Sequence, residues 1–262
     1  MTVPLLAGKR LLITGVVNTD SIAWSTAAAA IDAGAEVVLS GLGRDLESTR
    51  LAADSLRGDV AVVEADLTEP EHLERLSTEL RRRWGRLDGA LHAVAFAPRE
   101  ALAGDFLAAG PDAISRAFHT STQSYAALAK ILADLAPRQG GSIVGLDFDA
   151  AGAWPVYNWM GVCKAGLEAV NRYVARDLGR WRIRSNLVAA GPLHTRAADG
   201  IPEFERLTGA WDAQSPLPWD PKDGAPVADA VCFLLSDLSR MISGEIVHVD
   251  GGYHAMAAPI RS

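Results

Sequence analysis

Short runs of apolar, often β-branched residues recur along the chain, and longer segments with helical spacing separate them. This alternation of strand and helix is typical of a parallel sheet that helices cover on both faces. The predicted strands are 10–14, 36–40, 60–64, 89–93, 142–146, 184–189 and 246–249. The predicted helices are 21–33, 45–56, 71–84, 111–136, 157–178 and 227–235. Their order predicts a doubly wound α/β fold with a seven-stranded parallel sheet.

Two segments, 96–110 and 192–226, interrupt this rhythm, because they are long, irregular and rich in Pro, Gly and aromatic residues. In a doubly wound fold such segments follow the carboxyl ends of strands, where ligands bind. We therefore expect them to form walls of a substrate pocket, with 192–226 as a substrate-binding loop. No repeat or linker divides the chain, so residues 1–262 are expected to form one domain.

Composition excludes several classes of partner. The chain has 25 Lys+Arg against 32 Asp+Glu, a net charge of −7. This acidic balance does not suit nucleic acid or an anionic membrane surface, so any anionic ligand must be held by local geometry. Cys163 and Cys232 form no CxxC pair, and the six histidines are scattered without metal-ligand spacing. We expect no metal site, no membrane span and a reducing, cytoplasmic location.

The first predicted strand leads into Gly15, and a helix begins near Ser21 and Ile22. A strand, a glycine turn and a helix start are the parts of a phosphate cradle in a Rossmann-type fold. The usual GxGxxG is absent, so pyrophosphate would rest on the positive helix end at Ser21 and Ile22. A simple helix cap at Ser21 is the alternative.

The second predicted strand is followed by 41–44, which lacks the Asp or Glu that commonly holds the ribose of NAD. Arg44 could stack on adenine, pair a 2′-phosphate or lie on the surface. The residues alone therefore leave NADH and NADPH both open. Asp66 and Leu67 follow the third strand, where they could bind the adenine edge or begin a helix.

Tyr157 and Lys164 are seven residues apart, which is two turns along one face of a predicted helix. The ammonium can lower the phenol's pKa and hold ribose hydroxyls. The phenol can donate a hydrogen bond to a substrate oxygen that gains negative charge during hydride transfer. A chance pairing on a helix surface is the alternative.

Several ordered motifs together resemble the NADH-dependent trans-2-enoyl-acyl-carrier-protein reductases, a divergent branch of the short-chain dehydrogenase/reductase superfamily that serves fatty-acid and mycolic-acid synthesis. The enoyl reductases space their Tyr and Lys seven apart, as here, whereas other members of the superfamily space them four apart. The resemblance covers nearly the whole chain. The matching runs are 8–10, 15–23, 91–98, 141–149, 157–164, 184–192 and 244–252.

This resemblance implies reduction of the 2,3 double bond of an enoyl thioester, carried by acyl-carrier protein or coenzyme A, in a homotetramer that uses NADH. Tyr157 would polarise the thioester carbonyl and stabilise the enolate, Lys164 would hold the nicotinamide ribose, and Phe148 would lie beside the nicotinamide. The implied cofactor-binding residues are Gly15, Ser21, Ile22, Leu42, Arg44, Asp66, Leu67, Val94, Ala95, Lys164, Gly191, Leu193 and Thr195. The implied substrate-binding residues are Phe96, Tyr157, Met160, Phe204 and Leu207.

Two departures from the family pattern bear on function. The chain has Ala93-Val94-Ala95-Phe96 where the family commonly has Ser-Ile-Gly-Phe. The added methyl at Ala95 is expected to weaken cofactor binding, by about 1–3 kcal/mol if it overpacks. The segment 196–220 is short compared with the mycolic-acid branch, which predicts a shorter acyl substrate. The alternatives are a specialised-pathway enone or carbonyl reductase, and an inactive dinucleotide-binding regulator.

Overall fold

The computed structural model describes residues 4–201 and 203–258. Its strands form a seven-stranded sheet in the order β3-β2-β1-β4-β5-β6-β7, and every neighbouring pair is parallel. The strands are β1 (Arg10–Thr14), β2 (Glu36–Gly41), β3 (Ala61–Glu64), β4 (Gly89–His92), β5 (Gly141–Asp147), β6 (Ile183–Ala190) and β7 (Ile246–Val249). Each begins within one residue of its predicted start. The doubly wound α/β prediction is therefore confirmed.

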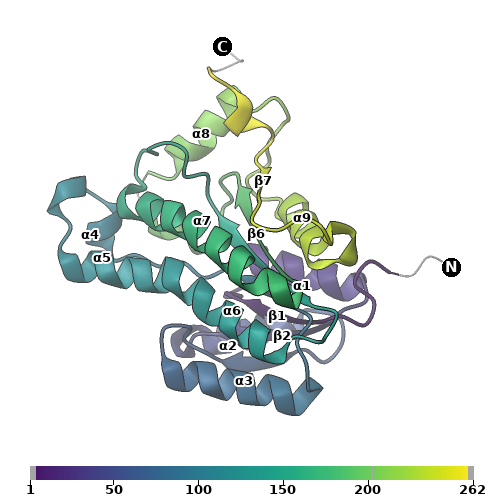
Figure 1. Cartoon of the computed structure of the whole chain (residues 1–262). Coiled ribbons are helices and arrows are strands. Elements are labelled where there is room, and N and C mark those ends of the chain that lie inside the picture. Colours follow the sequence, from purple (N-terminus) through teal and green to yellow (C-terminus); the bar gives the residue numbers. More distant parts are fainter. Residues whose placement is uncertain (1–3, 202, 259–262) are drawn as a thin grey trace.

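Helices cover both faces of this sheet (Figure 1). They are α1 (Ile22–Asp32), α2 (Leu46–Asp54), α3 (Pro70–Trp84), α4 (Arg99–Leu102), α5 (Pro111–Phe118), α6 (Ser124–Leu135), α7 (Asn158–Leu178), α8 (Glu205–Gln214) and α9 (Ala225–Leu235). One face packs against α1, α2 and α9, and the other against α3, α6 and α7. Across the two described ranges, no helix is both long and apolar enough to cross a membrane.

The two core layers follow from the alternation of side chains along the strands. Ile13 of β1 packs with Ala27 of α1 and Val231 of α9, whereas Leu12, one residue earlier, packs with Leu80 of α3 and Leu132 of α6. Successive residues of a strand point to opposite faces, so a sheet buried on both faces needs continuous apolar strands. This requirement explains the apolar centres of β1, β2, β3 and β5, whereas β6 also carries Ser185 and Asn186, which are buried and hydrogen-bonded.

The predicted helix 111–136 is interrupted in the structure, which corrects the prediction. A π-helical turn over His119–Gln123 separates α5 from α6. Hydroxyls in this turn bind other segments: Ser121 Oγ accepts from the Phe96 N–H and donates to the Phe96 carbonyl, both at 2.9 Å. Thr122 Oγ1 donates to the carbonyl of Cys163 at 2.8 Å. Short polar side chains that bond to backbone compete with regular helix, and π-turns often mark functional sites.

Both segments that were predicted to be irregular contain a short helix. Segment 96–110 holds α4, and segment 192–226 holds α8, which buries Leu207 and Trp211. Helix α8 lies beyond one end of the sheet, beside the C-terminal segment drawn in yellow (Figure 1). These helices, with α5 and α7, enclose a third apolar cluster that is separate from the two core layers.

Candidate active site

The strand order reverses between β1 and β4, and the segments that follow these two strands meet there. Gly15 has φ +81°, and a Cβ on it would lie 2.0 Å from the carbonyl oxygen of Ala93. Thr14 Oγ1 fixes the same contact, because it donates to the Leu91 carbonyl at 2.8 Å and accepts from the Ala93 N–H at 3.3 Å. Only glycine fits at position 15. In open α/β sheets, ligands bind at such a reversal.

Helix α1 begins at this crevice. Ser21 is its N-cap: the hydroxyl accepts from the Trp24 N–H at 3.3 Å and donates to the Asn18 carbonyl at 2.7 Å. The interpretation of Ser21 as a cap is therefore confirmed. The first turn, which Ile22 begins, contains no acidic residue, so the positive end of the helix is available to an anion. Pyrophosphate binding at Ser21 and Ile22 stays a prediction.

A carboxylate, that of Asp45, also follows β2. It lies one residue beyond the segment 41–44, which lacks an Asp or Glu. Asp45 Oδ2 is 3.3 Å from Nε of Arg44. Asp45 Oδ1 is 3.3 Å from a terminal nitrogen of Arg196, which comes from the loop after β6. The Asp45 side chain is 13% exposed. The guanidinium of Arg44 thus contacts both the Asp45 carboxylate and the ring of Phe96, whose centre is 5.7 Å away. Leu42, two residues before Arg44, is half-buried.

Phe96 lies away from the predicted acyl pocket. Its ring is between Arg44 and Arg116, whose guanidinium carbon is 5.0 Å from the ring centre. It does not belong to the apolar cluster that contains Tyr157 and Met160. Both guanidinium groups form cation–π contacts with the Phe96 ring. The ring therefore belongs to the end of the crevice that contains Arg44. A role for Phe96 in substrate binding stays a prediction.

The other predicted contacts near the adenine are less distinctive. Asp66 Oδ1 accepts from the N–H and the hydroxyl of Thr68, at 2.9 and 2.6 Å, so it forms the turn that leads into α3. Leu67 is a core residue at 3% exposure. Val94 packs against the same core, whereas Ala95 is exposed. Ala95 is therefore not part of a packed core, and its effect on cofactor binding stays a prediction.

Tyr157 stands immediately before α7 rather than in its first turn. Its neighbours Val156 and Asn158 have φ of +60° and +39°, which β-branched residues such as valine rarely adopt. The Tyr157 carbonyl accepts from the Met160 N–H at 2.9 Å and so begins the helix. The Tyr157 ring centre is 5.0 Å from that of Phe148, which follows β5. Strained backbone is concentrated at functional sites, so this turn is a feature of the site.

Lys164 is buried beneath the same end of the sheet, with 6% of its surface exposed. Its ammonium donates to the carbonyl of Leu146 at 2.8 Å. Burial lowers the pKa of Lys164, and the charge of Asp147 acts in the opposite direction. An ammonium has three donors, and the bond to Leu146 uses one of them.

The expected effect of Lys164 on the phenol was wrong. The pKa of Tyr157 is raised, first by burial and then by the negative charge of Asp147. Desolvation disfavours a phenolate, so the hydroxyl stays protonated over the physiological range. Tyr157 is therefore equipped to donate a hydrogen bond and not to act as a base.

An apolar cluster adjoins Tyr157 and Phe148. It contains Met160 and Leu207, both buried, and Phe204 packs against it. Three rings that sequence reasoning missed complete this wall: Trp154, Trp211 and Tyr253. Trp211 stacks on Tyr253 with ring centres 3.9 Å apart, and Trp154 lies 5.1 Å from Phe148. The abundance of aromatic residues in 192–226 was the only sequence signal for part of this wall.

The loop after β6 closes the other side of the crevice. The N–H of Gly191 donates to the carbonyl of Val249 at 2.9 Å, and a Cβ at Gly191 would come within 2.7 Å of the rings of Trp211 and Trp219. Leu193 is buried, and Thr195 Oγ1 accepts from the Ala198 N–H at 3.3 Å. Gly191 is thus needed so that the loop can pass close to two indoles.

Comparison with known proteins identifies the family. The model of the enoyl-(acyl carrier protein) reductase family matches residues 15–254. The chain belongs to this family. It is 40% identical to an enoyl-acyl-carrier-protein reductase (NADH) of Mycolicibacterium smegmatis, over 95% of this chain and 97% of that protein. Similar enzymes of Neisseria meningitidis serogroup B and Bacillus subtilis are 41% and 35% identical, over 95% and 96% of this chain and 95% and 98% of theirs.

The residues of this enoyl reductase family member fit a dinucleotide. Gly15 brings its backbone against Ala93, the N-terminus of α1 is free of acidic side chains, and Lys164 lies under the end of β5. Asp147 is a further residue of this site, and the position of a carboxylate at the end of the apolar run 143–146 was a signal for it in the sequence. Both of its oxygens are buried, and no side chain in the described part of the chain donates a hydrogen bond to them.

Proposed function

We propose that this chain reduces the 2,3 double bond of an enoyl thioester, carried by acyl-carrier protein or coenzyme A, with NADH as the reductant. The observation that carries this proposal is the meeting of Tyr157, Phe148 and Lys164 at the carboxyl end of β5 in a member of this family. The relatives are named for this activity and this cofactor.

The site residues have distinct tasks in this reaction. NADH supplies the hydride that reaches C3 of the substrate. As C3 gains the hydride, negative charge develops on the thioester oxygen, and the protonated Tyr157 hydroxyl is the group that can donate to it. Lys164 would hold ribose hydroxyls, and the start of α1 at Ser21 would hold pyrophosphate. Addition of a proton at C2 completes the saturated thioester.

The apolar cluster provides the environment for the acyl chain. Met160 and Leu207 are buried, and Phe204 packs on them, so the walls are apolar on the side next to Tyr157. A dry, apolar surrounding strengthens the hydrogen bond from Tyr157 to a charged oxygen. Trp154, Trp211 and Tyr253 pack together in this cluster, and we infer that these bulky rings favour the shorter acyl substrates that loop length also predicts.

Purified protein, NADH and a panel of substrates test this proposal. We expect NADH oxidation with trans-2-enoyl thioesters of coenzyme A and of acyl-carrier protein, and none with simple ketones. Turnover of enones or carbonyl compounds without any thioester activity would favour a specialised-pathway reductase. NADH binding without turnover of any substrate would favour an inactive regulator, which the joint presence of Tyr157 and Lys164 argues against.

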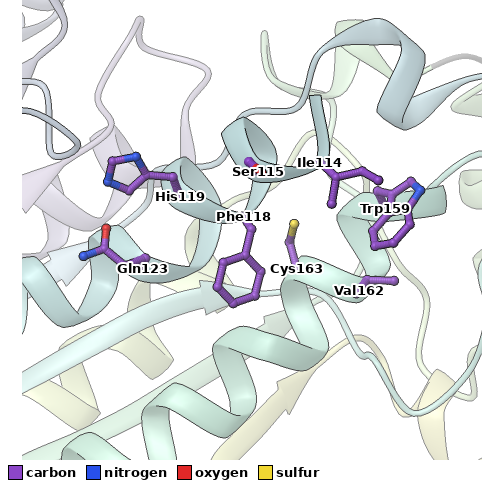
Figure 2. Close-up of a pocket in the computed structure, with 8 residues that line it drawn as sticks. All are labelled: Ile114, Ser115, Phe118, His119, Gln123, Trp159, Val162 and Cys163. Atoms are coloured by element: carbon purple, nitrogen blue, oxygen red, sulfur yellow. The ribbon is translucent and has the colours of Figure 1, made fainter. Parts of the chain in front are cut away.

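We propose further that the protein is a cytoplasmic homotetramer. Figure 2 shows an open groove between α5, the π-helical turn and α7, which is lined by Ile114, Ser115, Phe118, His119, Gln123, Trp159, Val162 and Cys163. Phe118 and Val162 are each 42% exposed on it. Exposed apolar patches mark contacts between subunits, and most oligomers are made of identical chains. Light scattering of the wild type and of Phe118→Asp tests whether a second copy covers this groove.

A further inference from the structure

Asp147 is a buried acid at the end of β5, next to Phe148. It is 5% exposed, and no side chain within the described ranges donates a hydrogen bond to either carboxylate oxygen, although the nearby N–H of Phe148 helps to stabilise the charge. An ionised carboxylate in such a place is costly unless a charge or a donor compensates it. Asp147 therefore needs an explanation that the core packing does not give.

The placement of Asp147 makes Lys164 its partner. Ile143 packs on the sheet face that α6 and α7 cover, and Asp147, four residues further along β5, shares that face. Lys164 of α7 donates to the carbonyl of Leu146, the residue before Asp147. The other titratable groups whose charges act on this pair are Glu168 and Cys163 of α7, Asp149 after β5, His92 of β4, Tyr125 of α6 and Tyr157 before α7.

The Asp147 carboxylate and the Lys164 ammonium form no direct hydrogen bond within the described ranges. A carboxylate that bonded to the ammonium would use donors that Lys164 needs for a ribose. Asp147 instead acts on Lys164 through its field, since neither of its oxygens bonds to the ammonium within the described ranges. Such an arrangement opposes the effect of burial on the ammonium and leaves its remaining donors to a ligand.

We propose that Asp147 is a positioning residue for the dinucleotide: it is the countercharge that keeps the buried Lys164 ammonium charged beside the Leu146 carbonyl. This inference rests on the proposed function, in which Lys164 holds the nicotinamide ribose. Asp147 acts through Lys164 and needs no contact with the substrate.

The protonation of Asp147 gives the proposal a pH signature. Burial raises the pKa of Asp147 to about 7, with the charge of Lys164 and the backbone N–H of Phe148 lowering it and the charges of Glu168 and Asp149 raising it. Below this pH the carboxyl is neutral, so its field no longer holds the Lys164 ammonium in place beside the Leu146 carbonyl. We therefore expect NADH affinity of the wild type to fall as the pH drops through about 7, and we expect Asp147→Asn to remove this dependence.

A double-mutant cycle on NADH affinity tests the proposal. The dissociation constant is measured by calorimetric titration of the full chain with NADH, from mildly acidic to alkaline pH, for the wild type, Asp147→Asn, Lys164→Gln and the double variant. Asp134→Asn, which changes an exposed ion pair on α6, is the matched control. Circular dichroism checks that every variant is folded.

We expect Asp147→Asn to weaken NADH binding by about tenfold or more at alkaline pH, with a smaller effect at acidic pH. In the Lys164→Gln background the same change should alter affinity less than about twofold. Equal effects in both backgrounds, or an effect that does not vary with pH, would overturn the inference and show a merely structural role. Absence of NADH binding by the wild type would overturn the proposed function, and the inference with it.

Discussion

Gly15 and Ala93 approach so closely that a methyl group on Gly15 would lie 2.0 Å from the Ala93 carbonyl oxygen. This contact joins the segments that follow β1 and β4, where the strand order reverses. Gly15→Ala must therefore move one of the two backbones. We expect a loss of about 2–4 kcal/mol in the free energy of unfolding, from strain and overpacking together, measured by denaturant titration, and a weaker affinity for NADH.

Gly58→Ala is the matched control for this prediction. Gly58 has a similar φ of +89°, but a Cβ on it would meet nothing within 4 Å. It therefore reports the strain of the positive φ alone, which we expect to be about 1 kcal/mol. If the two variants lose the same stability, the contact with Ala93 has no energetic importance.

The fold was predictable because the sheet is buried on both faces. Most strand positions are then apolar, and the apolar run itself shows where a strand lies. The π-helical turn was not predictable, because the segment 111–136 has helical spacing throughout, and only the tertiary bonds of Ser121 and Thr122 show where the helix is interrupted.

The site was predictable only in part. Tyr157 and Lys164 were found because their spacing is local in sequence. Asp147 and the Trp154–Trp211–Tyr253 wall were missed, because their significance depends on what surrounds them in space. The shift in the phenol's pKa was predicted with the wrong sign, because burial and the nearby charge of Asp147, which the sequence does not reveal, both raise it.

Tyr157→Phe tests the role of the hydroxyl. We expect kcat for an enoyl thioester to fall by about 10²–10³, since one donor to the developing enolate is lost, while the dissociation constant for NADH stays the same. Tyr173→Phe, at a position of α7 that is 60% exposed, should have no effect on either quantity. Unchanged turnover in Tyr157→Phe would exclude the proposed hydrogen bond.

Trp154→Leu tests whether the aromatic wall sets acyl length. The wild type should prefer crotonyl to dodecenoyl thioester. Removing the Trp154 ring, which lies 5.2 Å from Trp211 and 5.5 Å from Tyr253, should raise kcat/KM for dodecenoyl relative to crotonyl by about fivefold or more, about 1 kcal/mol of differential binding. Trp181→Leu, at a half-exposed indole after α7, is the control. A wild-type preference for the longest chain would contradict this account.

Asp45→Asn tests how NADH is preferred to NADPH. Asp45 is 3.3 Å from both Arg44 and Arg196, so its charge occupies two guanidinium groups that would otherwise attract a 2′-phosphate. Neutralising it should raise the ratio of kcat/KM for NADPH to that for NADH by about tenfold. Asp54→Asn, at the exposed end of α2, should leave the ratio unchanged. If Asp45→Asn also leaves it unchanged, coenzyme choice is made elsewhere.

Asp147→Asn should make the protein without NADH more stable at alkaline pH, although it weakens cofactor binding. Burial raises the pKa of Asp147 to about 7 in the folded state, above its value in the unfolded chain. A group whose folded pKa is raised contributes stability below its unfolded pKa, and this contribution is lost as the pH rises through about 7. Asparagine resembles the neutral acid, so the two proteins should have similar Tm only where Asp147 is also protonated in the unfolded chain, at about pH 3. Near about pH 8, thermal and denaturant unfolding should show the variant to be more stable, by at most about 4 kcal/mol. A stability difference that stays constant across this range would mean that Asp147 does not titrate in the folded protein near pH 7.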